Sequence, residues 1–165
     1  MQTILTHQDI KNKLRRIAYQ IYEANVDEQT IVLAGISKNG FVLAQRLKQI
    51  IEEISPISCV LCEVTMNKDS PLGTVKIALK AEVYKDKSLV LIDDVLNSGT
   101  TLVYGVKYFL DVPLKKFKTA VLVNRNHKKY PVKADFKGIS LSTSLNERVK
   151  VRLNPGDDKA FLAES

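Results

Sequence analysis

The feature that most constrains the fold of this chain is an apolar run, Ser88 to Ile92 (SLVLI), followed directly by Asp93 and Asp94. A run this apolar is typical of a central strand that is covered on both faces. Two adjacent carboxylates at the end of such a strand are costly to desolvate unless hydrogen-bond donors or a cation satisfy them. A vicinal diol with a bound divalent cation would do so. The end of this strand is therefore the first candidate for a ligand site.

Other stretches of the chain have the periodicity of amphipathic helices. Apolar residues recur at spacings of three and four in residues 9–25 and in residues 41–54, which predicts helices that lie on a core. Residues 102–110 offer a third helix. Further apolar runs are expected to be strands: 31–34, 57–65, 75–79 and 119–123. The tail from 138 to 153 is expected to form short strands and turns.

Strands and helices that alternate along a chain predict an α/β fold, with a mainly parallel central sheet and helices on both faces. Ligands of such sheets sit at the carboxyl ends of the strands. Two segments follow such ends and are expected to be loops, Gly35–Gly40 (GISKNG) and Asp93–Thr101 (DDVLNSGTT). Residues 66–73 are polar and contain a proline and a glycine, which predicts a mobile loop.

The length and composition suit one globular domain over residues 1–165, since 45% of the chain is hydrophobic and 26% is charged. The sequence near Met1 lacks the basic start and apolar stretch of a secretory signal. No apolar run approaches the ~18 residues of a membrane helix. A cytoplasmic protein with no membrane partner is therefore expected.

Two cysteines, Cys59 and Cys62, form a lone C-x-x-C motif. Such a motif occurs in redox pairs and in halves of zinc sites. Both cysteines fall in an expected strand, however, where residues three apart point to opposite faces. Two buried structural thiols are the favoured interpretation.

Positive charge is concentrated in the second half of the chain. Residues 107–152 contain twelve Lys or Arg residues and three acids, so this stretch has a net charge of +9. The whole chain has a net charge of +7, so the rest of it is slightly acidic. A basic surface attracts polyanions, whether phosphorylated metabolites or nucleic acid. A solvated basic face without a partner is the alternative.

The second half of the Asp93–Thr101 segment has the features of an anion site. Ser98, Gly99, Thr100 and Thr101 precede a predicted helix, where free backbone N–H groups, the helix dipole and three hydroxyls converge. Gly99 allows a close approach of the backbone. The alternative is that the two carboxylates and Ser98 are ordinary caps, but caps explain neither carboxylate's burial.

The segment Val90 to Thr101 (VLIDDVLNSGTT) resembles the signature of type I phosphoribosyltransferases: a hydrophobic strand, two acids, two hydrophobic residues, a variable residue and a T/S-G-x-T loop. The resemblance implies a site for the ribose 5-phosphate part of 5-phosphoribosyl 1-diphosphate. Asp93 and Asp94 would be the catalytic pair and hold the ribose diol. Magnesium would be held by the substrate and not directly by the protein. The remaining residues of the site would be these: Asn97, Ser98, Gly99, Thr100 and Thr101.

The GISKNG segment is not a nucleotide-triphosphate P-loop, because Phe41 and Val42 follow Gly40. In the resemblance it falls where the diphosphate is bound, often with a non-proline cis peptide. The implied diphosphate-binding residues are Ser37, Lys38, Asn39 and Gly40. A plain strand-to-helix turn is the alternative.

Nearly the whole chain resembles one branch of the family, the bifunctional pyrimidine-operon attenuators and uracil phosphoribosyltransferases. The stretch VLVNRNHKKYPVKADFKG is similar to that branch's V-D-R-G-H-R-E-L-P-I-R-A-D-Y-x-G. The resemblance implies a small hood that faces the base, with Val95, Arg125 and His127 as base-binding residues. A solvated Arg and His in a basic turn are the alternative.

Three departures bear on the substrate. Hypoxanthine-guanine enzymes carry Asp where this chain has Asn97, and an amide is no general base at neutral pH. The family's T-x-Y-R-D-D segment is here Thr65 to Asp69 (TMNKD) with a shorter loop, which indicates a trimmed lid. The D-R-G-H of the family is N-R-N-H here.

The expected function is transfer of a 5-phosphoribosyl group to a nucleobase, uracil in the first place, by a homo-oligomer, a dimer. A purine phosphoribosyltransferase is one alternative. Another is a UMP-sensing, RNA-binding regulator of pyrimidine genes with little turnover, which the +9 stretch and the trimmed lid favour. A phosphoribosyl-binding scaffold with neither role ranks last.

Overall fold

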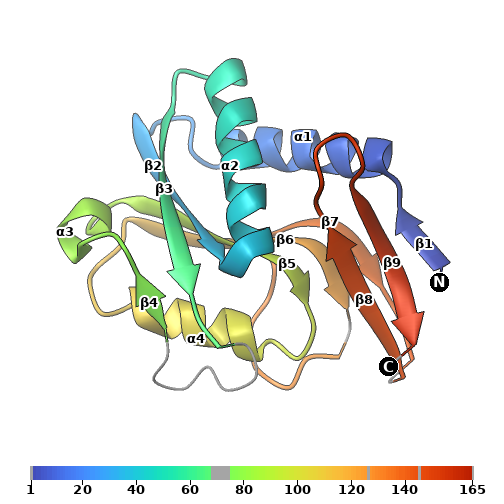
Figure 1. The fold of residues 1–165 in the computed structure, drawn as a ribbon. Coiled ribbons are helices and arrows are strands. Elements are labelled where there is room, and N and C mark those ends of the chain that lie inside the picture. Colours follow the sequence, from blue (N-terminus) through green and yellow to red (C-terminus); the bar gives the residue numbers. More distant parts are fainter. Residues whose placement is uncertain (1, 68–74, 126, 145, 165) are drawn as a thin grey trace.

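The computed structural model describes residues 2–67, 75–125, 127–144 and 146–164. Two sheets organise this part of the chain (Figure 1). The central sheet has six strands in the order β4-β3-β2-β5-β6-β7, and all its neighbours are parallel except the β3–β4 pair. Its strands are β2 (Thr30–Ile36), β3 (Ser58–Thr65), β4 (Lys76–Ile77), β5 (Ser88–Leu96), β6 (Lys116–Arg125) and β7 (Phe136–Leu141).

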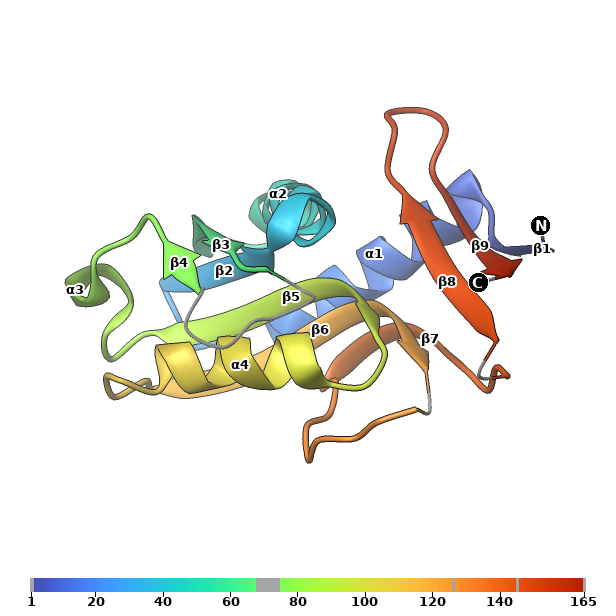
Figure 2. The same cartoon turned by 60° about the horizontal axis from the view of Figure 1, so that its bottom comes forward.

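Helices cover both faces of the central sheet, as Figure 2 shows. Helices α1 (His7–Glu23) and α2 (Ser37–Ile54) lie on one face, and α4 (Thr100–Phe109) lies on the other. The short helix α3 (Ala81–Tyr84) joins the α4 side, where Tyr84 meets Phe109 edge to face with ring centroids 5.2 Å apart. The predicted α/β class with a mainly parallel sheet is confirmed.

The second sheet is a three-stranded antiparallel hood that the periodicity of the sequence did not predict. It joins β1 (Gln2–Leu5), β9 (Lys159–Glu164) and β8 (Glu147–Arg152), so it brings the two ends of the described chain together. Arg46 of α2 holds it in place through a bidentate ion pair with the buried Asp158, at 2.6 Å and 2.9 Å.

The core is divided by the central sheet into two clusters. Cys59 belongs to the cluster under α1 and α2, and Cys62 to the cluster under α4. Both thiols are free and buried. Burial raises the pKa of Cys59 to about 12 and that of Cys62 to about 11. The prediction of structural cysteines on opposite faces of a strand is confirmed.

Two segments predicted to be loops, Gly35–Gly40 and Asp93–Thr101, are taken up wholly or largely by the strand before and the helix after them. Strand β5 continues through Asp93 to Leu96, since Leu96 is itself buried and its backbone pairs with β6. Strand β2 runs to Ile36, and α2 begins at the next residue, Ser37. The loop expected at 66–73 lies mostly outside the described residues.

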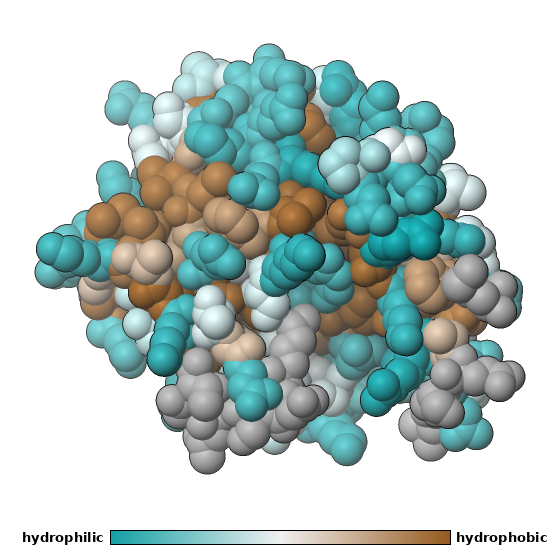
Figure 3. Space-filling view, in the orientation of Figure 1, coloured by the Kyte–Doolittle hydropathy of each residue, from teal (hydrophilic) through white to brown (hydrophobic). Residues whose placement is uncertain are grey.

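The surface in the orientation of Figure 1 is largely hydrophilic, as Figure 3 shows. Apolar residues gather toward the side that carries α3, where Val83 is 40% exposed. Within the described residues, no helix has the length and apolar character needed to cross a membrane.

Candidate functional site

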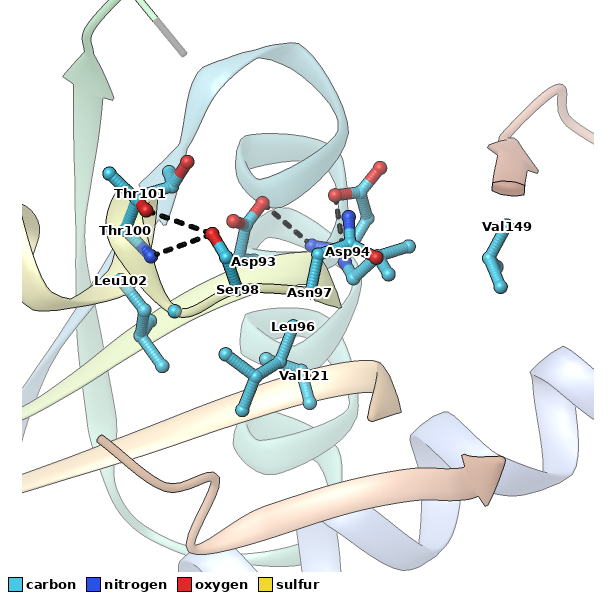
Figure 4. A pocket seen from close by; sticks show the side chains of 12 residues that line it. Asp93, Asp94, Leu96, Asn97, Ser98, Thr100, Thr101, Leu102, Val121 and Val149 are labelled. Carbon is cyan, nitrogen blue, oxygen red and sulfur yellow. Dashed lines mark hydrogen bonds between the residues drawn. The ribbon is translucent and has the colours of Figure 1, made fainter. Parts of the chain in front are cut away.

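A cavity of about 440 Å³ opens at the carboxyl end of β5. Figure 4 shows that its wall is formed by the end of β5, the turn that follows and the start of α4, with Val149 of the hood opposite. The predicted ribose-phosphate residues are therefore brought together in one place. The following residues line it: Asp93, Asp94, Val95, Leu96, Asn97, Ser98, Gly99, Thr100, Thr101, Leu102, Val121 and Val149.

The two carboxylates at the end of β5 are held by hydrogen bonds from the chain itself. Asp93, 2% exposed, accepts the backbone N–H of Asp94 at 2.8 Å. One oxygen of Asp94 accepts the backbone N–H of Val95 at 2.8 Å, and the other accepts Nδ2 of Asn39 at 2.9 Å. Oxygens of these two carboxylates line the cavity and could accept hydrogen bonds from the two hydroxyls of a ribose.

The turn after β5 is shaped to bind an anion. Gly99 has φ 87°, in the left-handed region, and a Cβ there would lie 2.7 Å from Cγ1 of Val132. The hydroxyls of Ser98 and Thr100 are 2.8 Å apart, and the Ser98 oxygen accepts the Thr100 N–H at 3.3 Å. The ten-residue helix α4 begins here, so its dipole favours negative charge at this turn.

Residues beyond β6 hold the same turn from outside. The carbonyl of Ser98 accepts the backbone N–H of Lys129 at 2.7 Å and that of Tyr130 at 3.3 Å. The turn is thus anchored through this carbonyl to the segment that follows β6.

The segment predicted to bind diphosphate forms the first turn of α2. Ser37 has φ 58°, an uncommon value outside glycine. The peptide bonds of the described residues are all trans, so the cis bond expected here is not part of this turn. Gly40 packs tightly under β5, because a Cβ there would lie 2.7 Å from the carbonyl oxygen of Ile92.

The four residues of this turn play different parts. Lys38 is exposed. Asn39 instead points inward, and its Nδ2 donates to Asp94 and to the carbonyl of Val151 in the hood, both at 2.9 Å. Asn39 therefore joins the turn, the acidic strand end and the hood.

A second cavity, of about 430 Å³, adjoins the first on the side of the hood. It is lined by Asn97, Arg125, His127, Glu147, Arg148, Val149 and Lys150. Asn97 and Val149 line both cavities. Of the three predicted base-binding residues, Arg125 and His127 lie in the second cavity, whereas Val95 lies in the first.

Arg125 is buried, at 6% exposure, and is not the solvated arginine of the alternative interpretation. Its Nε donates to Oγ1 of Thr143 at 2.8 Å, its Nη1 to Oδ1 of Asn97 at 2.9 Å and its Nη2 to the carbonyl of Glu147 at 2.8 Å. Burial lowers the pKa of this guanidinium, and the charge of Glu147 partly offsets the effect. An arginine nevertheless remains protonated and can only donate.

The ring of His127 is fixed by two contacts with the chain. Its Nδ1 lies 3.2 Å from Nη2 of Arg125, and its Nε2 lies 2.7 Å from the carbonyl of Thr143. Because Arg125 can only donate and a carbonyl can only accept, Nδ1 is the acceptor and Nε2 carries the proton. The ring of His127 is thus held in a fixed orientation at the wall of the second cavity.

The resemblance predicts a hood that faces the base, but the sequence did not indicate which residues of the hood belong to the site. Val149 and Glu147 of β8 line the cavities, and the carbonyl of Val151 accepts a hydrogen bond from Nδ2 of Asn39. No local pattern in these residues indicates this role, because it depends on the pairing of β8 with β9 and on the position of the hood.

The described residues contain no group of three or more His, Cys, Asp or Glu side chains that could hold a metal ion. The carboxylates of Asp93 and Asp94, which line the first cavity, are the groups there that could act as metal ligands. A magnesium ion is commonly bound through one or two carboxylates together with substrate phosphates.

The site thus combines a buried acidic strand end with the N-terminus of a helix, under a hood. The family model of the phosphoribosyl transferase domain matches residues 1–152, and the chain belongs to this family.

The chain is similar to relatives of known name over almost its full length. A bifunctional protein PyrR of Clostridium botulinum is 35% identical, over 99% of this chain and 96% of the relative. A bifunctional protein PyrR of Bacillus subtilis is 34% identical, over 97% of this chain and 94% of the relative. The predicted resemblance is confirmed.

Solved structures match the fold. A hypoxanthine-guanine phosphoribosyltransferase of Bacillus anthracis superposes with a TM-score of 0.78 at 19% identity, over 99% of this chain and 97% of that chain. A hypoxanthine phosphoribosyltransferase of Trypanosoma cruzi gives 0.79 at 14% identity, with the same coverage. Similarity at this level of identity establishes the shared fold alone.

Proposed function

We propose that the chain transfers the 5-phosphoribosyl group of 5-phosphoribosyl 1-diphosphate to uracil, giving UMP and diphosphate. The observation that carries this proposal is the position of Asp93 and Asp94 in one cavity with the anion-binding turn of Ser98 to Thr100. A diol site and a phosphate site on one short segment fit a ribose 5-phosphate. The family membership supplies the reaction class.

In this proposal the start of α4 binds the 5-phosphate through its N–H groups and the hydroxyls of Ser98 and Thr100. The carboxylates of Asp93 and Asp94 hold the two ribose hydroxyls. The transition state has oxocarbenium character, so the two nearby negative charges also favour the positive charge that develops on the ribose. Fixed hydrogen bonds to both carboxylates keep them in place, which supports catalysis by positioning.

The leaving diphosphate would lie toward the first turn of α2, where Lys38 supplies a cation. Asn39 acts there through Asp94 because its two N–H donors are already engaged. Magnesium would be held by the diphosphate and ribose oxygens of the substrate near Asp93 and Asp94. When bound, it would neutralise charge on the diphosphate as this group departs.

The base would enter the second cavity, between the hood and the end of β6. Val149, Arg125 and His127 form its wall. The hydrogen-bonding groups of Arg125 and His127 are largely taken up by the chain, so both residues shape the cavity more than they donate to the base. Assignment of uracil rests on the resemblance to the pyrimidine branch and on the amide at position 97.

The test is diphosphate release from 5-phosphoribosyl 1-diphosphate with magnesium and a panel of bases: uracil, cytosine, hypoxanthine and guanine. The expected result is turnover with uracil well above that with the purines. A matched control is Asp93→Asn, which should reduce turnover with every base alike. Turnover with hypoxanthine or guanine but not uracil would overturn the pyrimidine assignment. Failure of every base in the panel to give diphosphate release would overturn the assignment as an enzyme.

A second candidate is an RNA-binding regulator that senses UMP. It is favoured by exposed cations beyond β6, among them Lys128, Lys129, Lys133 and Lys137. Binding to RNA through such contacts weakens steeply as salt rises. UMP binding without turnover, together with salt-sensitive RNA binding, would favour this candidate over the enzyme.

A further inference from the structure

We infer that Asn97 is the residue that reads the nucleobase, and that Arg125 is a positioning residue that holds the Asn97 amide with its donor toward the base. This inference rests on the proposed function and adds a specificity-determining residue to it. It also accounts for a reaction in which no protein general base is apparent.

The location of Asn97 is the first observation. It is among the residues that line both the cavity of Asp93 and Asp94 and the cavity of Arg125 and His127. The bond between ribose and base forms where these two spaces meet. A side chain at that point is next to the nitrogen that attacks the ribose and to the atoms that flank this nitrogen.

The orientation of the amide is the second observation. Nη1 of Arg125 donates to Oδ1 of Asn97 at 2.9 Å. An arginine has donors only, so the amide must present its oxygen to Arg125, and the choice between oxygen and nitrogen is settled by chemistry. The Nδ2 group, a donor, therefore lies on the other side of the amide.

The rigidity of Arg125 is the third observation. Its other nitrogens donate to Thr143 and to the carbonyl of Glu147, and its side chain is buried. The guanidinium has little freedom to follow a rotated amide. A flip of Asn97 would place two donors against each other, so the orientation of Asn97 is locked from behind.

A fixed donor at this point favours a base with a carbonyl beside the attacking nitrogen. In uracil, N1 attacks C1′ of the ribose while the C1′–O bond to diphosphate breaks, and the electron pair of that bond leaves with diphosphate. The N1 proton is released to solvent, and the negative charge that develops on N1 spreads to O2. A hydrogen bond from Nδ2 of Asn97 to O2 stabilises this charge as it develops, and so lowers the barrier without a general base.

The test compares the affinities of UMP and of ribose 5-phosphate in the same variants, by calorimetry. Asn97→Asp keeps the size of the side chain and still offers an oxygen to Arg125, but replaces the donor by a second acceptor. The ratio of the affinity for UMP to that for ribose 5-phosphate should fall by about 10-fold or more, because the side chain then presents an acceptor to O2 of uracil in place of a donor. Ribose 5-phosphate alone should weaken only slightly, and the melting temperature should hold.

Two further variants separate this role from general damage. Asn97→Ala should lower the same ratio with no added charge. Arg125→Met should lower it as well, and the double variant Arg125→Met with Asn97→Ala should go no further than Asn97→Ala alone, since Arg125 acts through the amide. Asn12→Asp, on the exposed face of α1, carries the same chemical change away from the site and should leave the ratio unchanged.

The outcomes also distinguish this inference from the proposed function. An unchanged ratio in Asn97→Asp and Asn97→Ala would overturn the inference, whether or not uracil is turned over. If both variants lower the ratio but the wild type releases no diphosphate with any base, the inference is supported and only the proposed enzyme activity is refuted. A wild type that binds ribose 5-phosphate and UMP with equal affinity would overturn it too, as would a wild type that binds neither.

Discussion

Nδ2 of Asn39 donates to the carboxylate of Asp94 at 2.9 Å, which joins the first turn of α2 to the acidic end of β5. The same nitrogen donates to the carbonyl of Val151 in the hood, also at 2.9 Å. One half-buried amide thus ties together three elements that are far apart in the sequence. The position of the Asp94 carboxylate therefore depends on a residue that the sequence suggested for another task, the binding of diphosphate.

Replacement of Asn39 tests this link. Asn39→Ala should leave the Val151 carbonyl and Asp94 without this donor and cost about 1–3 kcal/mol of stability. Asn39→Asp should cost more, because a second carboxylate then faces Asp94. Chemical denaturation would give the free energies, with Asn12→Asp as the matched surface control. Equal stabilities of Asn39→Asp and Asn12→Asp would contradict the link.

The close approach of α2 to β5 gives a second prediction. A Cβ on Gly40 would lie 2.7 Å from the backbone oxygen of Ile92, and backbone cannot give way as a side chain does. Gly40→Ala should therefore destabilise the protein by about 1–3 kcal/mol. Gly156→Ala is a suitable comparison, since φ is 79° there but no atom lies within 4 Å, which leaves backbone strain as its only cost. The prediction fails if Gly40→Ala melts at the wild-type temperature.

Thiol chemistry gives a third prediction. Burial raises the pKa of Cys59 to about 12 and that of Cys62 to about 11, so the reactive thiolate is scarce at pH 8. Iodoacetamide at pH 8 should label neither cysteine in the folded protein and both in denaturant. Mass spectrometry of the labelled chain would report the result. Rapid labelling of the native protein would show that the C-x-x-C motif is a functional pair after all.

Acid stability gives a fourth prediction. The backbone N–H of Cys59 and the ammonium of Lys48, both 2.9 Å from the Glu52 carboxylate, lower the pKa of this group below 4.5. A carboxylate with a lowered pKa stabilises the fold above its unfolded pKa, and this contribution is lost as the pH falls through the folded pKa.

Glu52→Gln should therefore melt below the wild type at pH 7, by about 1 °C since the group is largely exposed. The difference should shrink as the pH falls below 4.5. Glu53→Gln, at the exposed neighbouring position of the same helix, serves as the control. A difference between Glu52→Gln and wild type that persists unchanged at low pH would be inconsistent with this account.

The elements that the sequence predicts well are those whose burial follows a local period. Helices α1, α2 and α4 and the central strands all lie where their apolar residues recur. The acidic end of β5 and the turn before α4 lie together because both belong to one short segment that follows a buried strand. What the local pattern missed was that the strand itself continues to Leu96.

The hood could not be predicted in the same way. β1 and β9 pair across nearly the whole length of the chain, between Thr3 and Phe161 for example. A pairing of that sequence separation leaves no local signal. The burial of Arg125 was missed for the same reason, since its partners Thr143 and Glu147 come from the turn before β8 and from β8 itself.

The central claim is that the turn at the start of α4 and the acidic end of β5 form one ribose 5-phosphate site. Calorimetry with ribose 5-phosphate tests it most directly, on the wild type, on Thr100→Val and on Asp93→Asn. Thr100→Val keeps the shape of the side chain and removes the hydroxyl that meets Ser98 at 2.8 Å. We predict binding to the wild type and a loss of about 10-fold or more in each variant. Equal affinity in all three proteins, or no binding to the wild type, would contradict the claim.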